Sequence, residues 1–297
     1  MPRLTIHHKT EYRYAHPVAF GEHRIMLRPR DGHDLRVLSG DLRIEPVPMS
    51  LRWIHDVFGN SVAIATFDER ADCLTVTSTV TVEHYPTEAF ALTPDDPAYF
   101  YPFLYDEEEF PDLKQYITPQ YGDPQGELSA WARDFLDAEA PTPTFKVLSQ
   151  MTHAIHDAFA YRKRHEQGTQ HPLDSLQMGS GTCRDFALLM VEALRRLGIA
   201  ARFVSGYLFV PSDAAHGYAG AGSTHAWVQV YLPSAGWIEF DPTNGIIGSR
   251  DLIRVAVARD PRQAIPLHGT YLGPAEAFDE MVVNIDVISA FEMETED

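Results

Sequence analysis

The feature that most constrains this chain is a glycine-broken turn that leads directly into a helical pattern. The turn reads Gly179-Ser180-Gly181-Thr182 and is followed by Cys183, Arg184 and Asp185. Apolar residues then recur at intervals of three and four, which predicts an amphipathic helix with one buried face at Phe186, Leu189, Met190, Ala193 and Leu197. Gly198 can adopt the left-handed conformation that ends such a helix.

Cys183 is expected at the first position of this helix. Thr182 is a suitable N-cap, and Asp185 can return a hydrogen bond to it as in a capping box. Unpaired N–H groups and the positive end of the helix dipole at this position favour a thiolate over a thiol. The same N–H groups could receive the negative oxygen of a tetrahedral intermediate. The turn therefore favours a nucleophile, although an intracellular cysteine usually just packs.

Composition limits the class of protein. A length of 297 residues favours two domains. The formal net charge of −18 argues against binding to nucleic acid or to an anionic membrane, because both would be repelled. Cys73 and Cys183 are the only cysteines, so no disulfide framework is expected, and Cys73 is expected to pack among apolar strand residues. Without a signal-peptide pattern or an apolar run of spanning length, we expect a cytoplasmic location.

Three regions follow from the patterning along the chain. Residues 1–90 predict a small antiparallel β-sandwich, because short alternating segments, clearest over residues 73–85, are separated by turns. Residues 91–126 are rich in proline and acidic side chains, and we expect a linker, or a segment that lies against a surface through its aromatic residues. Residues 127–297 are expected to form the second domain.

Two helices are expected at the start of the second domain, over residues 127–139 and 145–161. The second of them carries His153, His156 and Asp157, which could suggest a metal. One turn of one helix does not make a site, and the histidines of the first domain repeat no ligand spacing either, so we expect no metal.

Residues 223–243 predict a β-hairpin whose first strand alternates cleanly. If Tyr231 lies opposite Trp237, two polar residues fall on one face of the sheet as diagonal neighbours. They are His225 and Asp241, about 7 Å apart at the backbone and close enough for their side chains to bond. A slip of one residue would place them on opposite faces, so the register is part of the prediction.

These three residue types fit nucleophilic catalysis. An imidazole can hold the thiol proton near neutral pH and later deliver it to a leaving amine, while a carboxylate fixes its tautomer and stabilises the cation. Taken alone, His225 or Asp241 would more often be an ordinary structural residue. Together with Cys183 they predict a catalytic triad.

The sequence resembles the bacterial transglutaminase-like superfamily. Four segments carry the resemblance, in the order Cys, His, Asp: Gly181-Thr182-Cys183-Arg184-Asp185-Phe186-Ala187, residues 197–207, Thr224-His225-Ala226-Trp227 and Trp237-Ile238-Glu239-Phe240-Asp241-Pro242-Thr243. Residues 47–67 look like the β domain that precedes this core in bacterial members, and residues 255–260 and 266–271 look like the segment that follows it.

The resemblance implies an α+β fold, with a papain-like, transglutaminase-like core in which the helix bearing Cys183 packs on an antiparallel sheet. It implies Cys183 as nucleophile, His225 as general acid and base, and Asp241 as the residue that orients the histidine. No metal or organic cofactor is implied. For the second oxyanion donor we weigh Gln177, which lies six residues before the cysteine, and Tyr207.

Three functions stay open from the sequence. We favour a thiol hydrolase, a peptidase or amidase that cleaves an amide or isopeptide bond of a peptide or protein-like substrate. The alternatives are an acyltransferase that passes the same acyl group to an amine, as a transglutaminase does, and a non-catalytic binding module. The sequence indicates neither the substrate, nor the oligomeric state, nor the role of the N-terminal domain.

Overall fold

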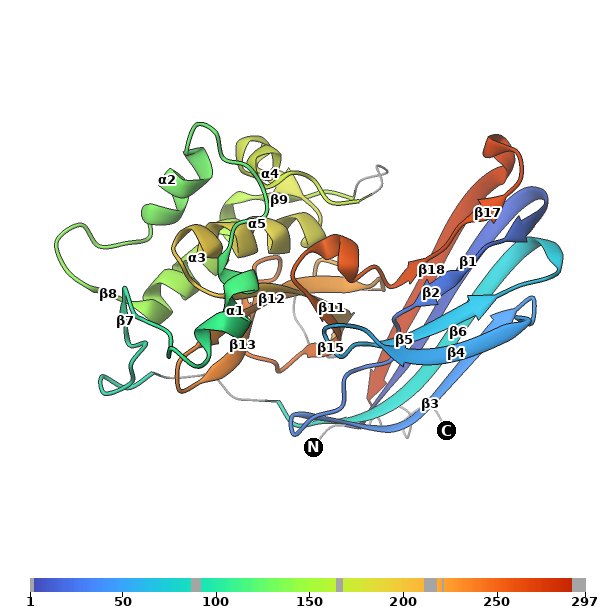
Figure 1. Cartoon of the computed structure of the whole chain (residues 1–297), viewed down its shortest axis with the longest axis horizontal. Coiled ribbons are helices and arrows are strands. Elements are labelled where there is room, and N and C mark those ends of the chain that lie inside the picture. Colours follow the sequence, from blue (N-terminus) through green and yellow to red (C-terminus); the bar gives the residue numbers. More distant parts are fainter. Residues whose placement is uncertain (1–2, 87–91, 164–167, 211–217, 221, 290–297) are drawn as a thin grey trace.

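The computed structural model describes residues 3–86, 92–163, 168–210, 218–220 and 222–289. Figure 1 shows an elongated molecule with a β-sandwich at one end and a helix-covered sheet at the other. The predicted α+β class and the N-terminal β region are confirmed. None of the helices in this described part has the length and hydrophobicity that a membrane span requires.

The N-terminal sandwich consists of two antiparallel sheets. One has the strand order β17-β1-β6-β3, with β18 also paired to β1, and the other has the order β16-β2-β5-β4. The strands of the first sheet are β1 (Arg3–Phe20), β3 (Leu35–Glu45), β6 (Arg70–His84), β17 (Tyr271–Leu272) and β18 (Phe278–Ser289). Those of the second are β2 (His23–Ile25), β4 (Ser50–His55), β5 (Ser61–Thr66) and β16 (Leu267–His268). Alternate residues of β6 are buried, as the pattern over residues 73–85 predicted.

The last strand, β18, belongs to the N-terminal sheet. It runs antiparallel to β1, from the pair Leu4 and Ser289 to the pair Tyr14 and Phe278. This differs from the sequence-based division, which placed all of residues 127–297 in the second domain. The reason is that β1 has 18 residues, and without β18 one edge of this long strand would expose unpaired backbone groups.

The segment expected to be a linker packs against the second domain. Within residues 92–126, helix α1 (Phe110–Ile117) buries Tyr116 against the core. The Tyr105 hydroxyl accepts a hydrogen bond of 2.7 Å from the backbone N–H of Ala200. The segment therefore follows the second of the two predicted behaviours and wraps a surface with its aromatic residues.

The second domain has a five-stranded antiparallel sheet in the order β14-β13-β12-β11-β15. Its strands are β11 (Ala201–Leu208), β12 (His225–Leu232), β13 (Gly236–Asp241), β14 (Ile246–Ile247) and β15 (Leu252–Ala258). Four helices accompany it, α2 (Glu127–Arg133), α3 (Thr144–Ala158), α4 (Pro172–Met178) and α5 (Cys183–Arg196). Short elements complete the chain, namely β7 (Phe100–Tyr101), β8 (Thr142–Pro143), β9 (Ala160–Tyr161), β10 (Ser180–Gly181), η1 (Pro261–Gln263) and η2 (Ala275–Ala277).

Both helices predicted at the start of this domain exist but are shorter. Helix α2 ends at Arg133 rather than at residue 139, and α3 ends at Ala158 rather than at residue 161. Helix α3 cannot continue because Ala160 and Tyr161 leave the helix to form β9, which pairs in parallel with β10. That pairing brings the end of α3 beside the turn before Cys183.

Helix α5 is the central helix of the domain. It packs on β11 and β12, while α2, α3 and α4 lie around it (Figure 1). All of its predicted core residues are buried, but Leu188 and Val191 on the other side are buried too. The sequence predicted one buried face, whereas the surrounding helices enclose the helix on several sides.

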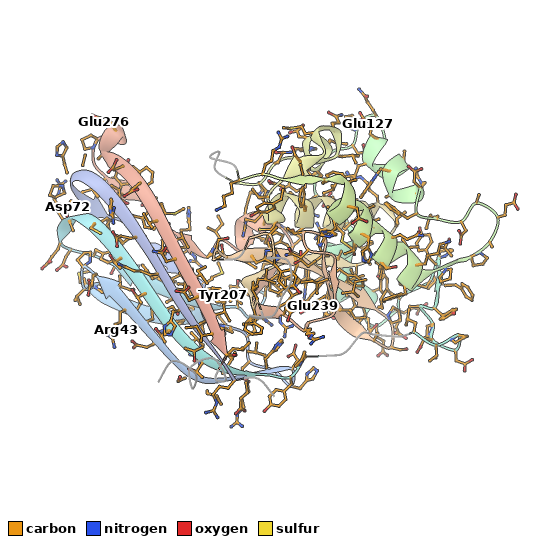
Figure 2. All side chains as sticks on the ribbon, turned by 180° about the vertical axis from the view of Figure 1, so that it is seen from behind. Arg43, Asp72, Glu127, Tyr207, Glu239 and Glu276 are labelled. Atoms are coloured by element: carbon orange, nitrogen blue, oxygen red, sulfur yellow. The ribbon has the colours of Figure 1, made fainter. Side chains whose placement is uncertain are left out.

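The two domains share polar contacts that fix the central sheet. The Asn60 side chain donates to the Val257 carbonyl at 2.8 Å and accepts from the Val257 N–H at 2.9 Å, so it caps the edge strand β15 as another strand would. The Tyr207 hydroxyl of β11 lies 3.0 Å from Nδ1 of His8 in β1. Figure 2 shows Tyr207 at the junction between the sandwich and the helical domain.

Replacing Asn60 with alanine should destabilise the whole chain. Both backbone groups of Val257 would lose their buried partner, so we expect the free energy of unfolding in urea to fall by about 3 kcal/mol. Asn284→Ala, on the exposed face of β18, is the matched control and should change it by less than about 0.5 kcal/mol. Equal effects of the two variants would contradict this interpretation of the domain contact.

Candidate active site

Cys183 is the first residue of α5, as predicted. The Asp185 carboxylate accepts hydrogen bonds of 2.8 Å from both the N–H and the hydroxyl of Thr182, which fixes the turn before the cysteine. Asp185 also accepts from the N–H of Gln170 at 2.6 Å. The helix start is therefore tied to two segments of chain and holds the thiol in one place.

Gly181 is required by this geometry. A Cβ atom at this position would lie 2.9 Å from the Cβ of Asp185, closer than two carbon atoms can approach. Any larger residue would push the capping carboxylate away from Thr182. The glycine before the cysteine thus serves the close approach of Asp185, whereas Gly179 provides the left-handed end of α4 with φ 56°.

The predicted hairpin register is confirmed. Tyr231 pairs with Trp237 across β12 and β13. The resulting neighbours meet, because Nε2 of His225 lies 2.7 Å from Oδ2 of Asp241. Both side chains are completely buried, so this contact is shielded from water. The ring of Trp227 stacks beside that of His225 with their centroids 6.0 Å apart.

Asp241 is held by more than the histidine. Its Oδ1 accepts from the N–H of Thr243 at 2.9 Å, and its Oδ2 accepts from the side-chain amide of Asn244 at 2.9 Å. Burial alone would raise the pKa of Asp241, but the charge and hydrogen bond of His225, together with these donors, lower it. Asp241 is therefore an ionised acceptor that fixes the ring.

His225 is left with one ring nitrogen for the cysteine. Nε2 is occupied by Asp241, and Nδ1 is buried without another partner in the described part of the chain. Burial alone would lower the pKa of His225, but the charge and hydrogen bond of Asp241, followed by the influence of the neighbouring Cys183, raise it above its ordinary value. The structure thus brings together all three predicted residues, with the imidazole between the sulfur and the carboxylate.

Asn244 was missed by the sequence analysis. Besides binding Asp241, its Oδ1 accepts from the N–H of Ala219 at 2.8 Å. It therefore ties the chain that precedes β12 to the carboxylate. The sequence signal here, an asparagine followed by Gly245 after a strand, indicates a turn and carries no information about this role.

Neither sequence-predicted oxyanion donor lies free at the site. The Gln177 amide is exposed on α4 and donates to Glu127 at 2.9 Å. The Tyr207 hydroxyl is buried in the domain junction, where it contacts His8 and donates to the Leu27 carbonyl at 3.3 Å. Both predictions are therefore corrected, because each side chain already has a structural partner elsewhere.

The other candidate features do not add to the site. His153 bonds the carbonyl of Ser149 at 2.7 Å and His156 that of Thr243 at 2.9 Å. Within the described ranges, no group of three or more His, Cys, Asp or Glu residues is arranged to hold a metal ion. Cys73 is half-buried in β6 and unpaired with another cysteine.

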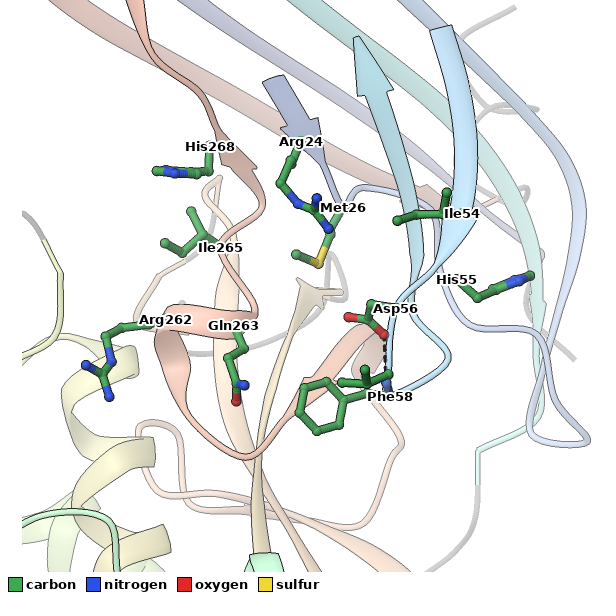
Figure 3. A pocket seen from close by; sticks show the side chains of 11 residues that line it. Arg24, Met26, Ile54, His55, Asp56, Phe58, Arg262, Gln263, Ile265 and His268 are labelled. Atoms are coloured by element: carbon green, nitrogen blue, oxygen red, sulfur yellow. Dashed lines mark hydrogen bonds between the residues drawn. The ribbon is translucent and has the colours of Figure 1, made fainter. Parts of the chain in front are cut away.

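A cavity of about 730 Å³ lies at the domain junction, away from the triad. Figure 3 shows Arg24, Met26 and His268 on the sandwich side facing Arg262 and Gln263 of η1. Its lining includes neither the cysteine, nor the histidine, nor the aspartate of the site.

Sequence comparisons identify the family of this chain. The model of the bacterial transglutaminase-like N-terminal region matches residues 4–83, and that of the transglutaminase-like superfamily matches residues 129–242. An uncharacterised protein of Mycobacterium leprae is 30% identical over 289 residues, which cover 96% of this chain and 99% of the relative. The chain belongs to the bacterial transglutaminase-like superfamily.

Two further similar proteins have informative names. A protein-glutamine gamma-glutamyltransferase of Pseudomonas aeruginosa is 30% identical over 136 residues, which cover 44% of this chain and 20% of that enzyme. The solved structure of a candidate cysteine protease from Cytophaga hutchinsonii has a TM-score of 0.70 at 19% identity, covering 97% of this chain and 91% of its own. The second likeness shows that this transglutaminase-like protein shares its two-domain fold with that structure.

The His225–Asp241 contact predicts a pH-dependent stability. The raised pKa of His225 adds stability that is complete below its ordinary 6.5 and is lost as the pH rises toward about 10, and the lowered pKa of Asp241 adds stability that is lost only as the pH falls below 3.8. In urea unfolding, Asp241→Asn should therefore cost about 3 kcal/mol near pH 5 and clearly less near pH 9.5.

Asp174→Asn is the control for this experiment. Asp174 is an exposed residue of α4, and its replacement should shift the unfolding free energy by less than about 0.5 kcal/mol at either pH. A cost of Asp241→Asn that stays constant over the whole range would show that the imidazole is not charged in the folded protein.

Proposed function

We propose that this protein is a thiol-dependent hydrolase that cleaves an amide or isopeptide bond of a peptide or protein-like substrate through an acyl-enzyme. In this proposal Cys183 is the nucleophile, His225 the general acid and base, and Asp241 the residue that orients the ring. The observation that carries it is the placement of one buried imidazole between a thiol at a helix start and an ionised carboxylate.

The chemical steps follow from this arrangement. The Cys183 sulfur forms a bond to the substrate carbonyl carbon, and the electron pair of the C=O bond moves to oxygen. When the pair returns, the C–N bond breaks, and His225 delivers the proton that the leaving amine needs. Water then attacks the thioester and gives its proton to His225, so that the carboxylic acid leaves and the sulfur is restored.

Transfer to an amine is the second candidate function. It uses the same thioester, but an amine replaces water as the attacking group. The specific observation in its favour is the likeness of 136 residues of the chain to the protein-glutamine gamma-glutamyltransferase. Hydrolysis remains our first choice, because water needs no binding site of its own, whereas transfer to an amine needs a cleft that binds the amine and excludes water.

A non-catalytic role is disfavoured by the state of the site. Burying an ionised aspartate against a histidine costs free energy that well-packed apolar residues would avoid. A protein that only binds a partner gains nothing from a buried, charged pair beside a thiol at the start of a helix. The intact triad therefore supports chemistry rather than binding alone.

Alkylation of Cys183 tests the activated thiol. Iodoacetamide at about pH 6 should label Cys183 at least roughly 100-fold faster than a free thiol, and His225→Ala should remove that advantage. Cys73→Ala is the matched control, because it removes the other cysteine and should leave the rate unchanged. Labelling of the wild type at the rate of free cysteine, unaffected by His225→Ala, would reject the enzyme interpretation.

The fate of the acyl group separates the two enzymatic functions. A peptide library with glutamine side chains and Nε-acyl-lysine bonds would be incubated with the protein, with and without a dansylated primary amine, and the products weighed by mass spectrometry. We expect the acid to exceed the amine adduct and Cys183→Ala to form neither. An excess of amine adduct would reject hydrolysis in favour of acyl transfer.

A further inference from the structure

Tyr161 lies beside the catalytic cysteine although its sequence position does not suggest it. It is the second residue of β9 and pairs in parallel with Gly181, two residues before Cys183. The backbone is fixed on both sides of it, because the N–H of Ala160 donates to the Gly179 carbonyl and that of Arg162 to the Gly181 carbonyl, each at 2.8 Å. The backbone that carries the Tyr161 side chain is therefore held in place at the edge of the site.

The hydroxyl of Tyr161 reaches the chain that covers the histidine. A Cβ atom on Gly220 would lie 3.6 Å from the Tyr161 hydroxyl oxygen and 3.2 Å from Nδ1 of His225. The phenol oxygen and the catalytic nitrogen are therefore less than about 7 Å apart, and both lie close to the same glycine, which has φ 88°. Both groups are therefore close enough to reach one reacting carbonyl group.

This hydroxyl is an available donor. It has no hydrogen-bond partner among the residues that the structure describes, unlike the hydroxyls of Tyr105, Tyr121 and Tyr207. Burial, followed by the negative charges of Cys183 and Asp185, raises the pKa of Tyr161 to about 12. The phenol therefore keeps its proton over the pH range in which a thiol enzyme works. The Cys183 sulfur is close enough for its charge to contribute to the raised pKa of Tyr161.

The reaction proposed above needs two donors for the negative oxygen of the tetrahedral intermediate. The backbone N–H of Cys183, at the first position of a helix, has no partner within that helix and supplies one. Gln177 and Tyr207 are bound elsewhere. We propose that the Tyr161 hydroxyl is the second oxyanion donor of this site, a role that rests on the proposed thiol chemistry.

An activated ester isolates the step in question. When the Cys183 sulfur attacks p-nitrophenyl acetate, an S–C bond forms and the carbonyl electron pair moves to oxygen, where Tyr161 O–H and Cys183 N–H donate to it. The pair then returns, the bond to p-nitrophenolate breaks, and the acetyl group stays on sulfur. Alkylation by iodoacetamide instead displaces iodide at a saturated carbon, so no oxyanion forms and this donor has no part in it.

The two reagents give Tyr161→Phe a specific signature. Acylation of Tyr161→Phe by p-nitrophenyl acetate, followed as release of p-nitrophenolate, should fall roughly 100-fold. Alkylation of the same variant by iodoacetamide should stay within about twofold of wild type, since the thiol and His225 are untouched. Tyr207→Phe is the matched control: it removes a buried tyrosine hydroxyl at the domain junction and should change neither rate by more than about twofold.

Each other outcome rejects this assignment. Unchanged acylation in Tyr161→Phe shows that the hydroxyl is no donor, while the proposed function stands. An equal fall of acylation and alkylation shows that Tyr161 acts on the thiol instead. If Tyr207→Phe reproduces the selective loss of acylation, the donor is not Tyr161. Wild-type acylation no faster than that of free cysteine rejects the thiol chemistry and this inference together.

Discussion

The hydrogen bond between His225 and Asp241 is the contact on which the rest of the structure depends. It is 2.7 Å long and fully buried, and a buried carboxylate is tolerable only if its charge is paired and its oxygens are satisfied. The register of β12 and β13 brings the two side chains together, the Thr243 N–H satisfies the other oxygen, Oδ1, and the Asn244 amide donates a second hydrogen bond to Oδ2. The capped start of α5 then places Cys183 at the free side of the ring.

The N-terminal sandwich contributes to the same geometry from outside. Strand β11 lies beside β12, with Gly206 opposite His225, and its next residue, Tyr207, bonds to His8 of β1. On the far edge of the sheet, Asn60 caps β15. Because these contacts hold two of the strands behind the histidine, we infer that the sandwich stabilises the sheet that presents the site. The long pairing of β18 with β1 makes the first and the last described strands part of that support.

The sequence was informative where the decisive rules are local. A capping residue and its partner lie three positions apart, and a hairpin register follows from a short turn, so the positions of Cys183, His225 and Asp241 could be predicted. The pairing of β18 with β1, and the place of Tyr161 beside Gly181, depend on segments far apart in the chain and leave no local pattern. The oxyanion donors were mispredicted for the same reason, since spacing from the cysteine does not show which partner a side chain finds.

The most direct test of this account is the protonation state of the His225 ring. Nitrogen-15 NMR of histidine-labelled protein at about pH 8, assigned with His225→Gln, reads both ring nitrogens. We predict a ring protonated on Nδ1 and Nε2, with a strongly deshielded Nε2 proton that disappears in Asp241→Asn, because the pKa of His225 lies well above its ordinary 6.5. A neutral ring at that pH, titrating near 6.5 and indifferent to Asp241→Asn, would contradict it.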